Sequence, residues 1–174
     1  MNSTVNSIVL IGMPGAGKST LGILLAKDLG MDFVDTDVAI QVREGRTLQD
    51  ILETSDYMNL RAIEEQVLLT EDIAGKVVAT GGSAVYSEAG MKRLKNMATV
   101  VFLDLSLDTL KTRITNFDRR GIARKPNQSL ESLFEERCNL YRKHTDLTID
   151  CNQQSLQQTL QSVTQQLLGY SQSS

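Results

Sequence analysis

Residues 7–20 read SIVLIGMPGAGKST, and this stretch decides the fold. Its apolar first half predicts a buried strand, and the pattern after it predicts a helix over residues 19–29. Between them the sequence G-x-x-x-x-G-K-S runs from Gly12 to Ser19, the pattern of a loop that surrounds a polyphosphate. A tight turn alone would explain the glycines, but it requires neither Lys18 nor Ser19. The stretch therefore predicts a phosphate-binding loop between a strand and a helix.

Each part of this loop has a physical task. Its glycines allow backbone dihedrals at which successive N–H groups turn inward, and the helix adds the positive end of its dipole. Lys18 reaches the β- and γ-phosphates, and the Ser19 hydroxyl binds Mg²⁺. We assign the nucleotide phosphates to Gly12, Gly15, Ala16, Gly17, Lys18, Ser19 and Thr20.

Size and charge restrict the function classes. The 174 residues, 41% apolar and 22% charged, predict one globular domain over residues 1–174. A net charge of −3 argues against a general nucleic-acid binder. The apolar run at the start is too short for a signal peptide or a membrane span, so we expect a cytoplasmic protein without a membrane partner.

The order of the remaining segments predicts an α/β fold. Four further apolar runs, each followed by a helical pattern, predict strands at 31–34, 77–80, 99–103 and 147–149. Five strands that alternate with helices imply a three-layer architecture, in which helices cover both faces of a parallel sheet.

Two segments do not fit a simple strand-helix alternation. Residues 38–73 are helical, punctuated only at Gly45, and are longer than a crossover needs, so we expect them to hold a second substrate. Residues 116–129 break the periodicity and carry Arg119, Arg120, Arg124 and Lys125. They predict a mobile lid. The basic run is either a solvated face or a group of charges that neutralises a leaving phosphate.

Paired carboxylates follow the second strand. Asp35 and Asp37 lie at its carboxyl end, where ligands bind in open α/β sheets. One carboxylate could serve Mg²⁺ through water while the other faces a substrate hydroxyl; alternatively, Asp37 only caps the next helix. Asp104 also ends a strand and is a second, weaker candidate for the magnesium side.

Two arginines have both a plain and a functional interpretation. Arg61 and Glu64 are three apart in a helix, a spacing typical of an ion pair, and Arg137 could be a solvated charge. A guanidinium is also the side chain best suited to grip a carboxylate through two parallel hydrogen bonds.

These segments together resemble the shikimate kinase family of P-loop kinases. The blocks follow that family's order over roughly residues 8–152, and they read GMPGAGKST, FVDTD at 33–37, LRAIE at 60–64, ATGGSAV at 79–85 and ERCNLY at 136–141.

The resemblance implies a role for individual residues. Asp35 would help to hold Mg²⁺, and Asp37 would bind and activate the acceptor hydroxyl. Arg61 and Arg137 would clamp the shikimate carboxylate. The resemblance further implies that the following residues line the acceptor pocket or bind ATP: Gly81 and Gly82 in the pocket, Arg124 as the catalytic lid arginine with Arg120 second, Arg113 against adenine, and Asn152 with the nucleotide.

The chain departs from the family at three places. Ser83 stands where the family usually has a third glycine, and Leu60 where it usually has an aromatic residue. The lid reads Arg124-Lys-Pro-Asn in place of Arg-Pro-Leu-Leu. Ser83 adds a side chain and a hydroxyl to the pocket for the sugar ring.

The resulting hypothesis is a monomeric, Mg²⁺-dependent kinase that transfers the γ-phosphoryl group of ATP to the 3-hydroxyl of shikimate. The alternatives are a related kinase of gluconate or another hydroxy acid, and a non-catalytic ATP-binding regulatory module. A nucleoside monophosphate kinase fits less well, because its loop usually has glycine at the position of Ser19.

Overall fold

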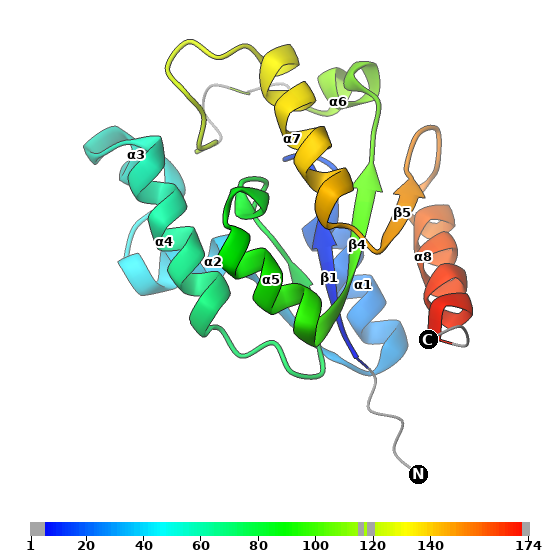
Figure 1. Cartoon of the computed structure of the whole chain (residues 1–174). Helices are drawn as coiled ribbons and strands as arrows, with labels where there is room; N and C mark the ends of the chain where they lie inside the picture. The colour runs from blue at the N-terminus through cyan, green and yellow to red at the C-terminus, as the bar shows by residue number, and fades with distance from the viewer. Residues whose placement is uncertain (1–5, 115–116, 118–120, 172–174) are drawn as a thin grey trace.

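The structure is a computed structural model that describes residues 6–114, 117 and 121–171, and a parallel sheet lies at its centre (Figure 1). The sheet has five strands in the order β2-β3-β1-β4-β5, and every neighbouring pair is parallel. The strands are β1 (Ser7–Ile11), β2 (Asp32–Asp35), β3 (Lys76–Ala79), β4 (Ala98–Asp104) and β5 (Leu147–Asp150). The predicted fold class is confirmed.

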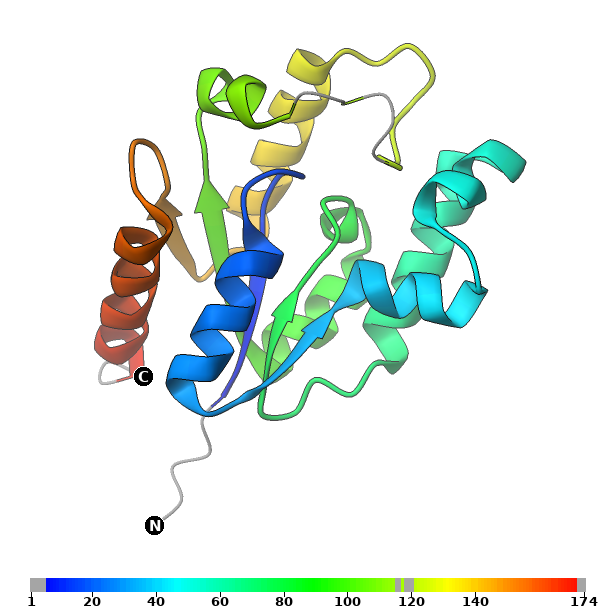
Figure 2. The ribbon, with the colours of Figure 1, turned by 180° about the vertical axis from the view of Figure 1, so that it is seen from behind.

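Helices cover both faces of this sheet, as predicted. Figure 1 shows α5 and α7 in front of the sheet, and Figure 2 shows α1 and α8 on the opposite face. The helices of the described residues are α1 (Lys18–Leu29), α2 (Thr36–Glu44), α3 (Leu48–Thr54), α4 (Tyr57–Thr70), α5 (Glu88–Met97), α6 (Leu107–Arg113), α7 (Leu130–His144), α8 (Leu156–Ser171) and the short 3₁₀ helix η1 (Ala84–Tyr86). None of the helices in the described ranges is long and apolar enough to cross a membrane.

The helical block 38–73 is divided into three helices, one break more than predicted. The first break comes at Gly45, whose φ of 65° ends α2 in the left-handed region. The second, unpredicted break precedes α4, where the Asp56 side chain accepts from the backbone N–H of Asn59 and caps the helix. Thr47 caps α3, with a reciprocal contact to Asp50.

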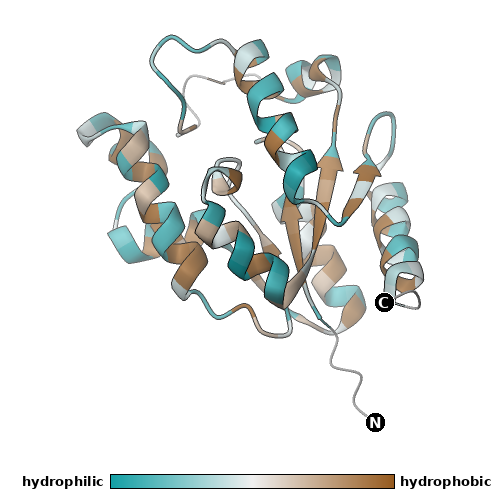
Figure 3. Ribbon diagram, in the orientation of Figure 1, coloured by the Kyte–Doolittle hydropathy of each residue, from teal (hydrophilic) through white to brown (hydrophobic). Residues whose placement is uncertain are grey.

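The sheet carries the main hydrophobic core. Figure 3 shows apolar residues concentrated on the strands, and all five residues of β1 are buried. At Gly22, α1 lies so close to the sheet that a β-carbon would come within 2.6 Å of the Phe33 ring. Because this contact joins the helix after the phosphate loop to β2, it fixes the distance between the two elements.

A second, smaller core holds the block α2–α4 together. Ile40, Ile51, Leu60 and Val67 are buried there with Ala123, which belongs to the described part of the predicted lid. The Gly121 N–H donates to the side-chain oxygen of Gln49 in α3 (3.0 Å). Segment 121–129, defined here as the described part of the lid after residue 120, therefore packs against the helical block.

Candidate active site

The phosphate loop lies between the end of β1 and the first turn of α1. Gly12 and Gly15 have φ of 148° and 89°, and close packing adds to the need for glycine there. A β-carbon would lie 2.9 Å from the Leu103 carbonyl oxygen at Gly12, and 2.9 Å from an Ile114 side-chain carbon at Gly15. Both backbone conformation and space therefore require glycine at these two positions.

Lys18 is buried at the start of α1. Its ammonium group donates to the backbone carbonyls of Gly12 (2.7 Å) and Met13 (2.9 Å). Burial lowers the pKa of Lys18 to about 8, and the negative charge of Asp37 works against that decrease. The loop thus carries a positive charge that is only partly compensated.

Ser19 and Asp35, the two predicted magnesium ligands, lie together. The Ser19 hydroxyl donates to Oδ2 of Asp35 (2.5 Å), and Oδ1 of Asp35 accepts from the N–H of Asp37 (2.9 Å) and of Val38 (3.3 Å). Asp35 is thus the N-cap of α2, so the capping alternative considered for Asp37 belongs to Asp35. Hydroxyl and carboxylate oxygens are hard donors that suit Mg²⁺.

A cavity of about 390 Å³ extends from the phosphate loop toward the helical block. It brings together most of the predicted site, including Asp37 of α2 and Arg137 of α7. The predicted residues that line it are Gly15, Gly17, Lys18, Ser19, Thr20, Asp37, Gly82, Arg113 and Arg137. Of segment 121–129, Gly121, Ile122 and Ala123 also contribute to the wall.

Asp37 lies deep in this cavity, beside Gly81. Burial raises the pKa of Asp37, while the positive charge of Lys18 lowers it. A β-carbon at Gly81 would collide with both the Asp37 and the Glu64 carboxylate, and one at Gly82 would lie 2.6 Å from Nη1 of Arg137. The two glycines therefore leave the space in which three charged side chains meet.

Arg137 is a buried charge, so its interpretation as a solvated residue is wrong. It is 1% exposed, and its Nη2 donates to the carbonyl of Ala123 (2.7 Å). Within the described part of the chain, nothing accepts from its Nε. A buried guanidinium with an unused donor can bind an anion.

Arg61 lines a neighbouring cavity of about 320 Å³ rather than the large one. Its guanidinium carbon lies 3.5 Å from the ring centre of Tyr86 and 5.0 Å from that of Tyr57. The described residues form no ion pair between Arg61 and Glu64, and none of them accepts from Nε or Nη2 of Arg61. The ion-pair interpretation is therefore wrong.

Glu64 and Ser83 belong to the site, although sequence reasoning left Glu64 out. The Ser83 hydroxyl donates to Oε2 of Glu64, and no described residue donates to Oε1. Burial, followed by the charge of Asp37, raises the pKa of Glu64 to about 7. Both residues line both cavities, so they lie at the boundary that the two cavities share. The signal that could have found Glu64 was Ser83, whose hydroxyl needs a buried partner.

The predicted lid arginines lie outside the large cavity or outside the described residues. Nη1 of Arg124 donates to the Gln128 carbonyl (2.5 Å), and its guanidinium carbon lies 4.5 Å from the Phe117 ring centre. Arg124 lines a third cavity, between segment 121–129 and the helices α3 and α4. Arg120 is outside the described residues. The assignment of either arginine to ATP stays a prediction.

Asn152 and Asp104 have structural partners elsewhere. Oδ1 of Asn152 accepts from the N–H of Ser106 (2.8 Å) and the hydroxyl of Thr109 (3.1 Å), so it joins the loop after β5 to α6. Asp104 pairs in register with Asp150 at the ends of β4 and β5. These contacts give no support to a magnesium role for Asp104, and the nucleotide role of Asn152 stays a prediction.

Comparison with known proteins gives a consistent result. The family model described as shikimate kinase matches residues 14–168. The chain is 38% identical over 139 residues to the shikimate kinase of Sulfurihydrogenibium sp., which covers 79% of this chain and 84% of that protein. A gluconokinase structure from Sinorhizobium meliloti, 21% identical with a TM-score of 0.53, covers 99% of each chain and shows similarity of fold alone.

A solved structure of the shikimate kinase from Acinetobacter baumannii in complex with shikimate is similar throughout. It is 33% identical, with a TM-score of 0.86, and the match covers 96% of this chain and 95% of that one. The chain therefore belongs to the shikimate kinase family, whose reaction is the ATP-dependent phosphorylation of shikimate.

Proposed function

We propose that the large cavity transfers the γ-phosphoryl group of ATP to the 3-hydroxyl of shikimate. The observation that carries this proposal is the meeting of Lys18, Asp37 and Arg137 in one cavity. These three side chains combine a phosphate ligand, a base and an anion-binding group. Phosphoryl transfer needs mainly positioning, charge neutralisation and a group that orients the attacking oxygen.

At the nucleotide end, the loop and Lys18 bind the phosphates, and Arg113, which lines the same cavity, would lie against the adenine. Ser19 and Asp35 would hold Mg²⁺, which neutralises and orients the phosphates when it is bound. The described residues hold no group of three or more His, Cys, Asp or Glu side chains suited to a metal. Mg²⁺ takes few protein ligands in such sites, and nucleotide phosphates and water would complete its coordination.

At the acceptor end, Asp37 accepts the proton of the attacking hydroxyl. Its burial makes the carboxylate a better base, because the charged form has lost solvation. The Arg137 guanidinium binds the acceptor carboxylate, and Arg61 approaches the same group from the neighbouring cavity. Lys18 balances the charge that develops between Asp37 and the phosphates.

The direct test is an ADP-release assay with ATP and Mg²⁺. We expect turnover that depends on shikimate and exceeds the rate with ATP alone. Gluconate and other hydroxy acids are the comparison acceptors. Folded protein that turns over gluconate and leaves shikimate unchanged would overturn the acceptor assignment, and no turnover with any acceptor would favour a binding module.

Three further properties are part of the proposal: Mg²⁺ dependence, a monomer and a cytoplasmic location. Removal of Mg²⁺ with a chelator should abolish turnover, and added Mg²⁺ should restore it. Light scattering should give the mass of one chain. A dimer in solution would contradict the monomer and leave the proposed chemistry untouched.

A further inference from the structure

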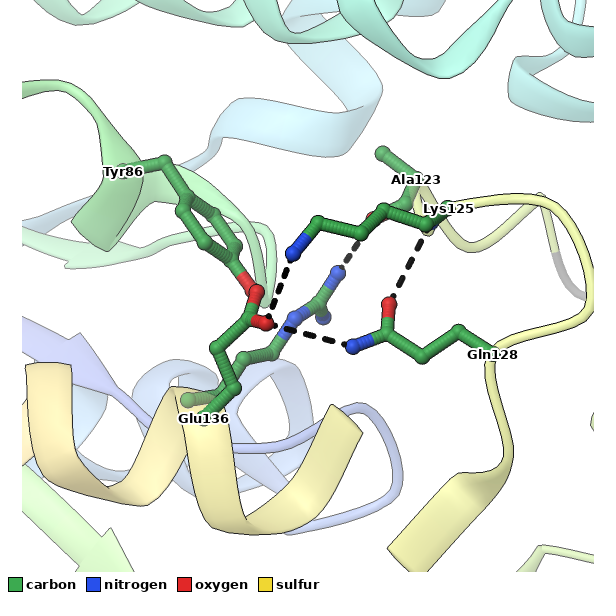
Figure 4. A network of polar contacts seen from close by, with 6 residues as sticks. Tyr86, Ala123, Lys125, Gln128 and Glu136 are labelled. Carbon is green, nitrogen blue, oxygen red and sulfur yellow. Dashed lines mark hydrogen bonds and ion pairs between the residues drawn. The ribbon is translucent and has the colours of Figure 1, made fainter. Parts of the chain in front are cut away.

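A network of polar contacts around Glu136 joins three parts of the molecule. Glu136 lies in α7, directly before the buried Arg137. Its Oε1 accepts from the Tyr86 hydroxyl, and its Oε2 accepts from Lys125 (3.1 Å) and from Gln128 (3.3 Å). Figure 4 shows these three side chains converging on the Glu136 carboxylate. We call Tyr86, Lys125, Gln128 and Glu136 the Glu136 network.

Tyr86 gives this network a second contact with the site. Its hydroxyl donates to Glu136, and its ring face packs against the Arg61 guanidinium, whose carbon lies 3.5 Å from the ring centre. The Arg137 guanidinium carbon lies 5.7 Å from the same ring centre. One aromatic ring thus stands beside both predicted carboxylate-binding arginines. Stacking of this kind restricts where a guanidinium can point.

Segment 121–129 is attached to the same network. Lys125 and Gln128 bind Glu136, and the Gln128 side-chain oxygen also accepts from the N–H of Lys125 (3.2 Å). Directly beside them, Arg137 binds the carbonyl of Ala123. The segment is therefore held by adjacent residues of α7, one of which is itself a proposed acceptor ligand.

The charges explain why such support is needed. Burial lowers the pKa of Arg61, and the nearby positive charge of Arg137 acts in the same direction. Two guanidinium groups repel one another, so some other contact has to keep Arg61 in place before an anion arrives. The Tyr86 ring supplies that contact, and the negative charge of Glu136 offsets part of the repulsion.

We propose that Tyr86 and Glu136 are positioning residues, which hold Arg61 for the acceptor carboxylate and couple acceptor binding to the seating of segment 121–129. This inference rests on the proposed acceptor role of Arg61 and Arg137. Coupling of this kind is reciprocal: an acceptor that fixes Arg61 also stabilises the segment, and a seated segment favours acceptor binding.

The test uses Tyr86→Phe, which keeps the ring, and Glu136→Gln, which removes the charge. We expect each to raise the KM for shikimate by roughly tenfold, since each loses hydrogen bonding to a charged group. The KM for ATP and kcat should change less than about threefold. The double variant should be little worse than either single one, because both remove the same connection. Glu131→Gln is the matched control, as Glu131 is an exposed glutamate of α7 that pairs with Lys111.

Hydrogen exchange supplies a readout that a merely structural role would not move. In the wild-type chain, shikimate should slow amide exchange in segment 121–129. In both variants that protection should be lost, while thermal unfolding and exchange elsewhere in α7 stay unchanged. Equal protection in variant and wild type, or additive KM effects, would overturn the inference.

The two proposals fail differently. A wild-type chain without shikimate turnover removes the proposed function. Suppose instead that Arg61→Ala weakens shikimate binding, whereas Tyr86→Phe and Glu136→Gln do not. That result would contradict only the positioning role.

Discussion

The nucleotide end and the acceptor end of the cavity are built in different ways. The nucleotide end is mostly one continuous stretch, from Gly12 to Ser19, whose backbone supplies the binding groups. The acceptor end is assembled from side chains of four distant segments, represented by Asp37, Glu64, Ser83 and Arg137. A contiguous backbone site can be read from a short pattern. A side-chain site depends on how separate elements pack.

The two ends also differ in how well their polar atoms are paired. Lys18 donates to two carbonyls of its own loop. Among the described residues, buried side-chain atoms without a partner concentrate at the acceptor end, in Arg61, Glu64 and Arg137; His144 is the exception. Unpaired buried polar groups destabilise a fold, and a ligand that pairs with them binds more tightly for the same reason.

The largest expected effect separates the two ends directly. Asp37→Asn removes the proposed base and should lower kcat by about 10²- to 10⁴-fold, the usual contribution of general base catalysis. Nucleotide affinity, measured by calorimetry, should change less than about threefold, because Asp37 does not belong to the loop. Asp32→Asn, at an exposed position of β2, is the control. If Asp37→Asn weakened ATP binding as strongly as it lowers kcat, the two ends would not be separate. Unchanged turnover would show that Asp37 is not the base.

Arg61→Ala tests the acceptor end alone. Loss of charge-assisted hydrogen bonds should weaken shikimate binding by about 1.5–3 kcal/mol, which is roughly a 10- to 150-fold higher KM. The KM for ATP should stay the same. Arg43→Ala, on the exposed face of α2, provides the comparison. An unchanged shikimate KM would mean that Arg137 binds the carboxylate without Arg61.

Glu64→Gln tests the stability cost of the acceptor end. The pKa of Glu64 is about 7 in the folded chain and 4.5 in the unfolded one, so the folded state binds its proton more tightly. Stability is therefore lost as the pH rises from 4.5 to 7, and the variant avoids that loss. At pH 8 the variant should unfold with a free energy higher by on the order of 2 kcal/mol, whereas at pH 4 the two should agree.

Urea unfolding at both pH values measures this difference. Glu65→Gln is the control, because Glu65 follows Glu64 in α4 and accepts from Ser87 (2.5 Å). If the Glu64→Gln variant is less stable than the wild type at pH 8, the contact between Glu64 and Ser83 stabilises the fold by more than the burial of the Glu64 charge destabilises it.

The smallest expected effect concerns the nucleotide end. The pKa of Lys18 is about 8, and the phosphates of bound MgATP should raise it. Binding at pH 8 should thus take up roughly half a proton, and binding at pH 6.5 almost none. Calorimetry in buffers with different ionisation enthalpies measures the uptake, and Lys18→Met should abolish it. No uptake at pH 8 in the wild-type chain would show that the ammonium is already fully protonated.

Sequence reasoning succeeded where local pattern decides the structure. The five strands and the phosphate loop followed from periodicity and a short motif, whereas the choice of Asp35 as the partner of Ser19 at the magnesium site came from the resemblance to the family. The second break in the helical block was missed, because a single aspartate, Asp56, caps α4 without a glycine or proline nearby. The position of a residue in the sequence does not show which residues its side chain will contact in the folded chain.

That limit explains the errors at the acceptor end. The helical spacing of Arg61 and Glu64 favours an ion pair, yet tertiary contacts give each a different partner, Tyr86 and Ser83 respectively. Arg137 was weighed as a solvated charge because its burial depends on segment 121–129, which covers it from a separate part of the chain. Such contacts between distant segments leave no pattern in one sequence.

The close approach of α1 to β2 at Gly22 has a consequence for metal dependence. This contact with Phe33 lies one turn along the helix from Ser19 and two residues before Asp35. A bulkier residue at position 22 would act as a wedge, moving the hydroxyl and the carboxylate apart without touching any ligand. The concentration of Mg²⁺ needed for half-maximal rate would then depend on how closely α1 packs against β2 at position 22.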